Sequence, residues 1–256
     1  MAHDFRLLTT GAGNAAYNMG SDEAILEAVA AEDALPTLRL YAWKPAAVSI
    51  GYFQGLYEEV DTAACAARGV DVVRRITGGG AVFHQAEITY SIVIPDAHPL
   101  AQRSILASYE RLCSGVMEGL SLLGIPSVFA PINDILTGGR KVSGNAQTRR
   151  RSCILQHGTV ILDLDVELMF DLLKVPAEKA KGKLIQDVKA RVTSVRSCLG
   201  RELAFPEAED AFSRGFAKAL DLVFAQKETA LAGSEDQRAR AIATEKFSDP
   251  AWTGKR

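Results

Sequence analysis

The sequence has few cysteines and no long apolar run. Its cysteines, Cys65, Cys113, Cys153 and Cys198, are widely scattered and form no CxxC pair, so it predicts neither a structural zinc site nor a disulfide framework. No uninterrupted apolar stretch is long enough to span a bilayer, and the first residues lack the basic and apolar regions of a signal peptide. We therefore expect a cytoplasmic protein in a reducing compartment.

A strong charge of either sign is also lacking. The 29 basic and 31 acidic residues give a net charge of -2, which provides no electrostatic reason to expect nucleic acid despite the local run at 149–151. Hydrophobic residues make up 48% of the 256 residues and charged residues 23%, as in ordinary globular proteins. No repeat or linker divides the chain, so we expect a single domain over residues 1–256.

Hairpin-like spacing dominates the first two-thirds of the chain, and helical periodicity dominates the rest. Strands are expected at residues 37–43, 47–54, 70–73, 81–83, 87–94 and 153–162, a hairpin about Gly138-Gly139 at 134–144, and helices at 21–30, 61–68, 104–123, 166–174, 206–223 and 236–247. A turn at Lys44-Pro45-Ala46 predicts that the first two strands form a hairpin. Because regular βαβ alternation is missing, we predict an α+β fold with a mixed or antiparallel sheet packed by helices.

A first glycine motif, Gly11-Ala12-Gly13-Asn14-Ala15-Ala16, fits the loose dinucleotide fingerprint. That fingerprint requires its acidic residue at the end of a second strand. Glu32 and Asp33 instead end a predicted helix, so the sequence argues against a nicotinamide cofactor.

A second glycine motif, Arg74-Arg75-Ile76-Thr77-Gly78-Gly79-Gly80-Ala81-Val82-Phe83-His84, separates two strand-like segments. Consecutive glycines are tolerated where the chain turns sharply or where a ligand touches the backbone. Exposed amides beside arginines suit an anionic ligand, although a tight turn beside a solvated arginine pair explains the run equally well.

Further motifs follow this loop in the sequence. They are Asn133-Asp134, the segment Lys141-Val142-Ser143-Gly144-Asn145-Ala146-Gln147, and Gln156-His157-Gly158. Together with Asn18-Met19, Asp22-Glu23, Gly51-Tyr52-Phe53-Gln54, Arg191-Val192-Thr193-Ser194-Val195 and Trp252, these segments resemble the catalytic domain of lipoate-protein ligases. That family shares its fold with biotin ligases and with lipoyl or octanoyl transferases.

The resemblance implies an ATP-dependent ligase that forms an acyl-adenylate from lipoate or octanoate and transfers the acyl group to a lysine of an acceptor. The implied catalytic residue is Lys141. The implied acyl-binding residues are Arg75, Gly78, Gly79, Gly80, His84 and Gly144, and the implied ATP-binding residues are Gly80, Val82, Phe83, Asn133, Asp134, Lys141, Ala146 and His157. Asp134 is the implied Mg²⁺ ligand.

The residue types suit these roles. Arg75 can hold a phosphate or carboxylate in its planar fork, and Lys141 is a compact charge that can reach two oxygens. Mg²⁺ in nucleotide sites takes one or two carboxylates, so Asp134 suits it, although the same residue could cap a turn. Strand alternation predicts that Lys141 and Ser143 face the pocket and Val142 faces away. His84 is expected to line the pocket as a hydrogen-bond donor rather than act as a general base, and His157 is expected to be a strand-edge support.

Two other functions stay open. The first is acyl transfer from acyl carrier protein through a cysteine thioester, but residues 126–134 and 163–196 contain no cysteine, and Cys153 is expected to be a buried apolar residue. The second is a non-catalytic lipoyl-binding subunit.

The resemblance also implies partners. We expect an acceptor that carries a lipoyl domain, such as a 2-oxoacid dehydrogenase E2 or a glycine-cleavage H protein. Many ligases of this family carry a further small C-terminal domain. The resemblance implies that residues 1–256 are a single catalytic domain without this accessory domain, so we expect a separate small accessory subunit. Neither nucleic acid nor a membrane is expected as a partner.

Overall fold

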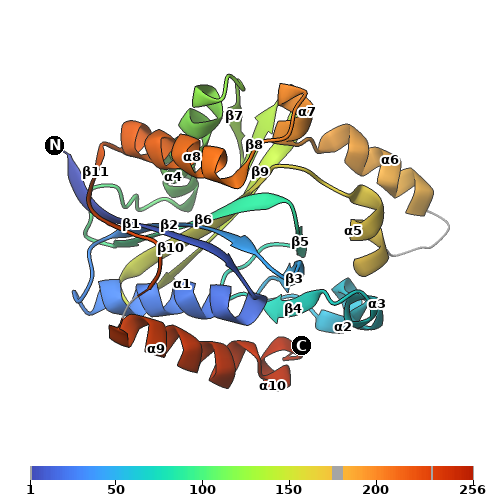
Figure 1. The fold of residues 1–256 in the computed structure, drawn as a ribbon, viewed down its shortest axis with the longest axis horizontal. Helices are drawn as coiled ribbons and strands as arrows, with labels where there is room; N and C mark the ends of the chain where they lie inside the picture. The colour runs from blue at the N-terminus through green and yellow to red at the C-terminus, as the bar shows by residue number, and fades with distance from the viewer. Residues whose placement is uncertain (1, 175–180, 232, 256) are drawn as a thin grey trace.

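The computed structural model describes residues 2–174, 181–231 and 233–255. One sheet of eight strands crosses the molecule in the order β11-β1-β2-β6-β10-β9-β8-β7 (Figure 1). Its strands are β1 (His3–Gly13), β2 (Thr37–Trp43), β6 (Glu87–Pro95), β7 (Val128–Ala130), β8 (Asp134–Thr137), β9 (Arg140–Arg150), β10 (Cys153–Ile161) and β11 (Leu222–Glu228). A smaller sheet has the order β4-β3-β5, formed by β3 (Ala47–Ile50), β4 (Asp71–Arg74) and β5 (Val82–His84).

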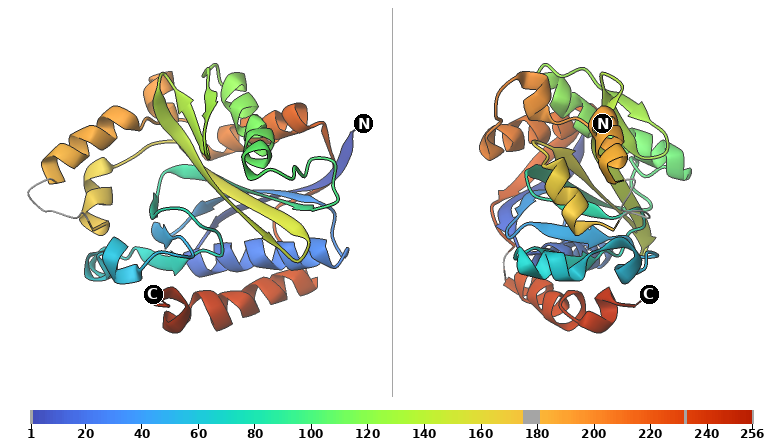
Figure 2. Two further views of the ribbon diagram at one scale, coloured as in Figure 1. Left: turned by 180° about the vertical axis from the view of Figure 1, so that it is seen from behind. Right: turned by 90° about the vertical axis from the view of Figure 1, so that its right-hand side faces the viewer.

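Helices cover both faces of the large sheet (Figures 1 and 2). Helices α4 (Ile105–Leu122) and α8 (Phe205–Leu220) pack together on one face, and α1 (Ala15–Ala30) packs with α9 (Gly233–Ile242) on the other. The remaining helices are α2 (Leu56–Glu59), α3 (Thr62–Ala67), α5 (Val166–Leu172), α6 (Lys181–Arg191), α7 (Val195–Leu199), η2 (Ala243–Phe247) and α10 (Pro250–Thr253). None of the helices in the described part of the chain has the length and apolarity needed to cross a membrane.

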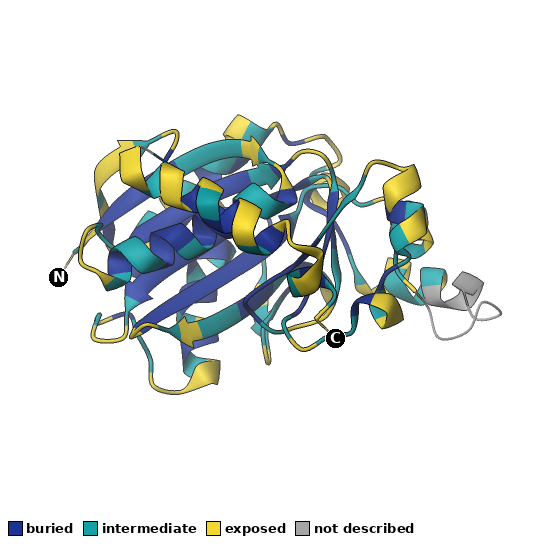
Figure 3. Ribbon diagram, turned by 90° about the horizontal axis from the view of Figure 1, so that it is seen from below, coloured by how far each residue is buried: buried dark blue, intermediate teal, exposed yellow. Residues whose placement is uncertain are grey.

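The α+β class with a mixed sheet is therefore confirmed. Pairing is parallel between β1 and its neighbours β2 and β11, and antiparallel from β2 through β6, β10, β9 and β8 to β7. Hydrophobic cores lie on both faces, one beneath α4 and α8 and one beneath α1. Figure 3 shows that the central strands are buried along most of their length.

Several local predictions were wrong. Strands β2 and β3 form no hairpin, because β2 pairs with β1 and β6 while β3 pairs with β4 and β5 in the smaller sheet. Helix α1 begins at Ala15 rather than Ser21, since Asn14 caps it by accepting a hydrogen bond from the Tyr17 amide. The expected helix at 206–223 ends at Leu220, and β11 follows it as an edge strand. The helix at 104–123 and the hairpin around Gly138-Gly139 are confirmed.

Glycines allow α4 and α8 to approach closely. A Cβ atom on Gly215 would lie 2.3 Å from the backbone nitrogen of Gly119, and one on Gly115 would lie 2.3 Å from the Phe216 ring. The two helices therefore cannot keep this distance if either glycine gains a side chain.

We predict that Gly215→Ala lowers the free energy of unfolding by about 1–3 kcal/mol, because the added methyl group meets backbone atoms that cannot rotate away. The loss should appear in urea denaturation even though alanine favours helix by about 1 kcal/mol. Arg214→Ala on the exposed side of α8 is the control and should change the stability by less than about 0.5 kcal/mol. A stability gain in Gly215→Ala would contradict the close approach.

Candidate active site

A cavity of about 340 Å³ lies between the glycine loop after β4 and the strands β9 and β10. Apolar side chains form much of its wall, including Met19, Trp43, Ile161, Leu164 and Val192. Polar groups of the glycine loop, β9 and β10 line the rest. Such a slot suits a ligand with an apolar chain and a polar end.

The two arginines at the start of the loop are buried and donate hydrogen bonds to backbone carbonyl groups, rather than facing solvent. Arg74, which is fully buried, donates to the carbonyl oxygens of Gly51, Tyr52 and Gln54 and to that of Thr253 in α10. Arg75 lines the cavity. Its Nη1 donates to the Ser49 carbonyl at 2.8 Å and to the Ser49 hydroxyl at 2.7 Å. A ligand would therefore meet a guanidinium that is already held in place.

The Arg75 guanidinium also fixes the shape of the loop. Its Nη2 donates to the carbonyl oxygens of Gly78 and Gly80, at 2.9 and 3.0 Å. Burial lowers the pKa of Arg75 to about 10, at which the group stays charged at neutral pH. The loop packs tightly on β3, since a Cβ atom on Gly51 would lie 2.0 Å from the Gly79 carbonyl oxygen. The predicted contact of Arg75 with a ligand anion stays a prediction.

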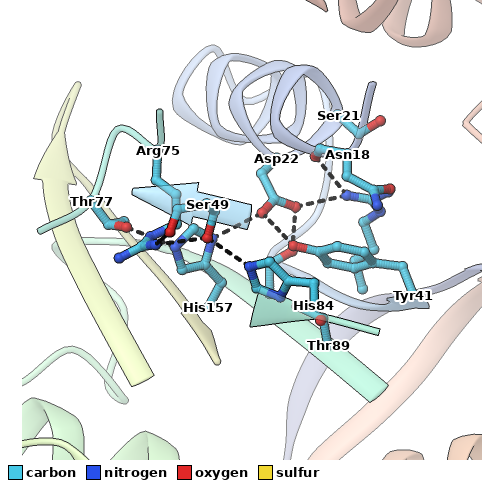
Figure 4. A network of polar contacts seen from close by, with 12 residues as sticks. Asn18, Ser21, Asp22, Tyr41, Ser49, Arg75, Thr77, His84, Thr89 and His157 are labelled. Atoms are coloured by element: carbon cyan, nitrogen blue, oxygen red, sulfur yellow. Dashed lines mark hydrogen bonds and ion pairs between the residues drawn. The ribbon is translucent and has the colours of Figure 1, made fainter. Parts of the chain in front are cut away.

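A buried carboxylate connects α1 to the sheet (Figure 4). Asp22 is 2% exposed and accepts hydrogen bonds from Arg39 at 2.9 Å, Ser91 at 2.8 Å and Tyr41 at 3.0 Å. Burial by itself would raise the Asp22 pKa, but the hydrogen bond with His157 and the charge of Arg39 outweigh burial and lower it. Asp22 is therefore a carboxylate, and its partners hold it in one position.

His157 extends this network to the glycine loop. Its Nδ1 lies 3.2 Å from Asp22 Oδ2, and its Nε2 lies 2.7 Å from the Thr77 hydroxyl. Burial lowers the His157 pKa, although the hydrogen bond with Asp22 opposes this shift. A neutral imidazole that donates from Nδ1 to Asp22 and accepts from Thr77 satisfies both contacts.

His84 belongs to a second network in the cavity wall. Because Arg75 donates to the Ser49 hydroxyl, that hydroxyl can donate to His84 Nε2 at 2.6 Å, and His84 Nδ1 can donate to Glu87 at 2.6 Å. The ring also stacks on Trp43, with centroids 4.0 Å apart. These contacts fix the ring on three sides, as expected of a pocket wall residue.

Lys141 lies near the start of β9, with its Nζ 2.6 Å from Asp134 Oδ1. Both side chains are about one-third exposed, at 38% and 33%. The Lys141 side chain crosses Gly144, where a Cβ atom would lie 2.8 Å from Nζ. The predicted hairpin therefore brings a cation and a carboxylate together beside the cavity.

The prediction for Ser143 was wrong. The β8–β9 register shifts between Ile135 and Leu136, and this bulge puts Lys141 and Gly144, rather than Lys141 and Ser143, on the cavity side. Ser143 is fully buried and pairs with Ile135 and Val160, which belong to the core beneath α4 and α8. Strict alternation predicted the wrong side for Ser143, because one extra residue in a strand reverses the face to which the following side chains point.

Most of the predicted site residues come together. Arg75, Gly79, Gly80, Val82, Phe83, His84, Asn133, Lys141, Gly144, Ala146 and His157 line the cavity, Asp134 contacts Lys141, and Gly78 contacts Arg75. Asp22, Arg39 and Glu87 were not among the residues predicted for the site. A signal was present, because Arg39 is a charged residue in the middle of an otherwise apolar strand and needs a buried partner.

Comparisons with known proteins show the family to which the chain belongs. Residues 14–217 match the lipoyl protein ligase A/B catalytic domain, so the chain belongs to this family of enzymes. It is 34% identical to octanoyltransferase LipM of Geobacillus kaustophilus and 37% identical to that of Symbiobacterium thermophilum, and both alignments cover 98% of each chain. The predicted family is confirmed.

Solved structures show the same likeness. The fold matches a bipartite lipoate protein ligase of Thermoplasma acidophilum with a TM-score of 0.87 at 28% identity, covering 98% of this chain and 97% of that one. It also matches a lipoate-protein ligase A bound with ATP, with a TM-score of 0.81 at 28% identity and 99% coverage of each chain. The chain is thus an enzyme of a family that includes ligases and octanoyltransferases.

The state of His157 gives a pH prediction. Its pKa in the folded chain lies below the value of about 6.5 in the unfolded chain, so the unfolded state gains the proton first as the pH falls. The stability that neutral His157 contributes is present above about pH 6.5 and is lost as the pH falls toward the folded pKa. Thermal unfolding should show a smaller loss between pH 7.5 and 5.5 for His157→Gln than for the parent.

The other three of the four histidines are present in both proteins, so the difference isolates His157. Equal losses in the two proteins would show that His157 does not titrate differently on folding.

Proposed function

We propose that the protein attaches a lipoyl or octanoyl group to a lysine of an acceptor protein and activates the free acid with ATP. The position of the cysteines is the observation that favours ATP over a cysteine thioester. A thioester route requires a thiolate beside the acyl carbon, whereas none of the four cysteines, all of them in the described part of the chain, lines the cavity.

The buried cysteines are also poor nucleophiles. Burial raises the pKa of Cys65 to about 11 and that of Cys113 to about 12, and it raises the pKa of Cys153. Cys153 begins β10 four residues before His157, a separation of roughly 13 Å along a strand. Cys198 is exposed on α7, outside the cavity lining.

Transfer from acyl carrier protein through a cysteine thioester is the second candidate. The names of the curated relatives favour it over the ATP-dependent route, since those relatives are octanoyltransferases. The alignment with the Geobacillus kaustophilus protein runs over 275 positions, more than the 256 residues of this chain, so that relative contains residues without a counterpart here. The likeness therefore does not by itself carry the reaction of that relative over to this chain.

Two chemical steps make up the proposed ATP route. A carboxylate oxygen of the acid attacks the α-phosphorus, the phosphoanhydride bond breaks and pyrophosphate leaves. The amine of the acceptor lysine then attacks the acyl carbon, loses a proton and displaces AMP. Lys141 is suited to the first step, because an ammonium group fixed between the carboxylate and the α-phosphate stabilises the charge that develops there.

Asp134 fits the role of the proposed Mg²⁺ ligand. Its carboxylate is partly exposed beside the cavity, and Mg²⁺ in nucleotide sites takes one or two carboxylates together with phosphate oxygens and water. The ion would supply charge neutralisation for the phosphates. Among the described residues no group of three or more histidine, cysteine or acidic side chains could hold a metal ion.

The similar Thermoplasma acidophilum ligase is described as bipartite and together with an E2 lipoyl domain. This likeness supports a lipoyl domain as the acceptor here, and it supports the predicted separate accessory subunit. Both partners remain proposals for this chain.

The first test separates the two routes by the acyl donor. We expect mass spectrometry to show acylation of an apo lipoyl domain with lipoate or octanoate only when MgATP is present, with an accessory subunit supplied in a parallel reaction. Cys153→Ser and Cys198→Ser should each keep more than half of the activity. Acylation from octanoyl acyl carrier protein without ATP, together with an inactive cysteine variant, would establish the transferase instead.

The second test concerns Lys141. We predict that Lys141→Ala lowers pyrophosphate release by about 10² to 10³, the usual loss when one group that stabilises a transition-state charge is removed. Lys141→Arg should rescue poorly, because its planar fork is wider than a compact ammonium. Arg140→Ala, at the exposed neighbouring position, is the matched control. A rate within about tenfold of the parent at unchanged thermal stability would remove Lys141 from the site.

A further inference from the structure

A line of polar side chains lies within the apolar layer beneath α4 and α8. It consists of Gln147, Gln156, Tyr90, Asn145 and Asn133. Gln156 is fully buried and Tyr90 is 2% exposed. Polar groups at this depth destabilise a core unless every one is hydrogen-bonded, so their arrangement calls for an explanation.

Gly158 makes the central contact possible. On β10 it pairs with Tyr90 of β6 on one side and with Asn145 of β9 on the other. Since Gly158 has no side chain, the Tyr90 hydroxyl reaches across it to Asn145 Oδ1 at 2.7 Å. A Cβ atom on Gly158 would lie 2.0 Å from that oxygen and 2.8 Å from Tyr90 Cε1.

The hydrogen bonds of this line run in one direction. Gln147 donates to Gln156 at 3.0 Å, and Gln156 donates to the Tyr90 hydroxyl at 2.6 Å. The hydroxyl therefore has its own proton to donate to Asn145 Oδ1, which turns the Asn145 amide nitrogen toward the Asn133 carbonyl oxygen at 2.9 Å. Hydrogen bonds in such a chain polarise and strengthen one another.

The line ends beside the proposed reaction site. Asn133 returns a hydrogen bond from its side chain to the Asn145 carbonyl, so the two asparagines clamp each other. The next residue, Asp134, pairs with Gly144 and contacts Lys141 at 2.6 Å. Asn133 therefore adjoins the Asp134–Lys141 pair, and its carbonyl oxygen accepts hydrogen bonds from both the side-chain amide and the backbone N–H of Asn145, the latter at 3.1 Å.

We propose that Tyr90 is a positioning residue for the reaction, and that its hydroxyl fixes Asn145 and through it the Asn133–Asp134 segment beside Lys141. This inference rests on the proposed acyl transfer but not on the choice between ATP and acyl carrier protein. On this proposal Tyr90 contributes to the reaction rate but not to binding of the acyl chain. The apolar side chains of the cavity wall, such as Met19, Trp43 and Ile161, lie outside this line, so loss of the hydroxyl should affect the reaction rate and spare binding of the acyl chain.

The test is Tyr90→Phe, which removes one oxygen and keeps the ring that packs on Phe216. We expect kcat for acylation of an apo lipoyl domain, measured with whichever donor the parent uses, to fall about 10- to 100-fold, the effect of a misplacement near 1 Å. The Kd for octanoate, measured by calorimetry, should stay within about twofold of the parent. Tyr109→Phe is the matched control, because its hydroxyl lies on α4 outside the line, near the Gln147 backbone.

A kcat within about twofold of the parent, a parallel loss of octanoate binding, or an equal loss in Tyr109→Phe would overturn the proposal. If Tyr90→Phe does not fold, Gln156→Leu breaks the line one step earlier while the Tyr90 hydroxyl stays. It should lower kcat about fivefold with octanoate binding unchanged, and an unchanged kcat there would equally overturn the role of the line. A parent that uses acyl carrier protein instead of ATP would refute the proposed ligase and leave this test in place.

Discussion

Burial of the Arg39 guanidinium is the constraint on which the site depends. Arg39 is 1% exposed in the second strand of the large sheet, and a charge at that depth is tolerated only beside an opposite charge with its hydrogen bonds made. Asp22 supplies that charge, and it simultaneously binds Tyr41, Ser91 and His157. Removing one partner of such a pair typically costs about 3–5 kcal/mol, so α1 and the central strands are fixed relative to one another.

Strand β10 contacts elements on both sides of the proposed reaction site. Its alternation sends His157 to one face, where it holds Thr77 at the start of the glycine loop, and Gln156 to the other, where it begins the contact with Tyr90. One strand therefore positions the loop that closes the cavity and the segment that carries Asp134. Both positions are built on the sheet rather than on flexible loops, as a site that aligns two reactants requires.

The family includes both lipoate-protein ligases and octanoyltransferases. Acyl activation by ATP needs a cation and a metal-binding carboxylate near the acid, the roles proposed for Lys141 and Asp134. A thioester route needs an accessible thiol, whereas three of the four thiols here are buried. Membership of the family therefore defines the fold, whereas the burial of three thiols is what supports the proposed ATP route over a thioester.

The sequence by itself determined the α+β class, the glycine loop, the hairpin around Gly138-Gly139 and part of the cavity lining, because turn residues and separate motifs can be recognised along the chain. Tertiary structure decided the rest. The β8–β9 bulge turned Ser143 into the core, and strand pairing placed β2 and β3 in different sheets. The pairing of Asp22 with Arg39 and the contact of Tyr90 across Gly158 join residues far apart in sequence, and only the folded sheet brings them together.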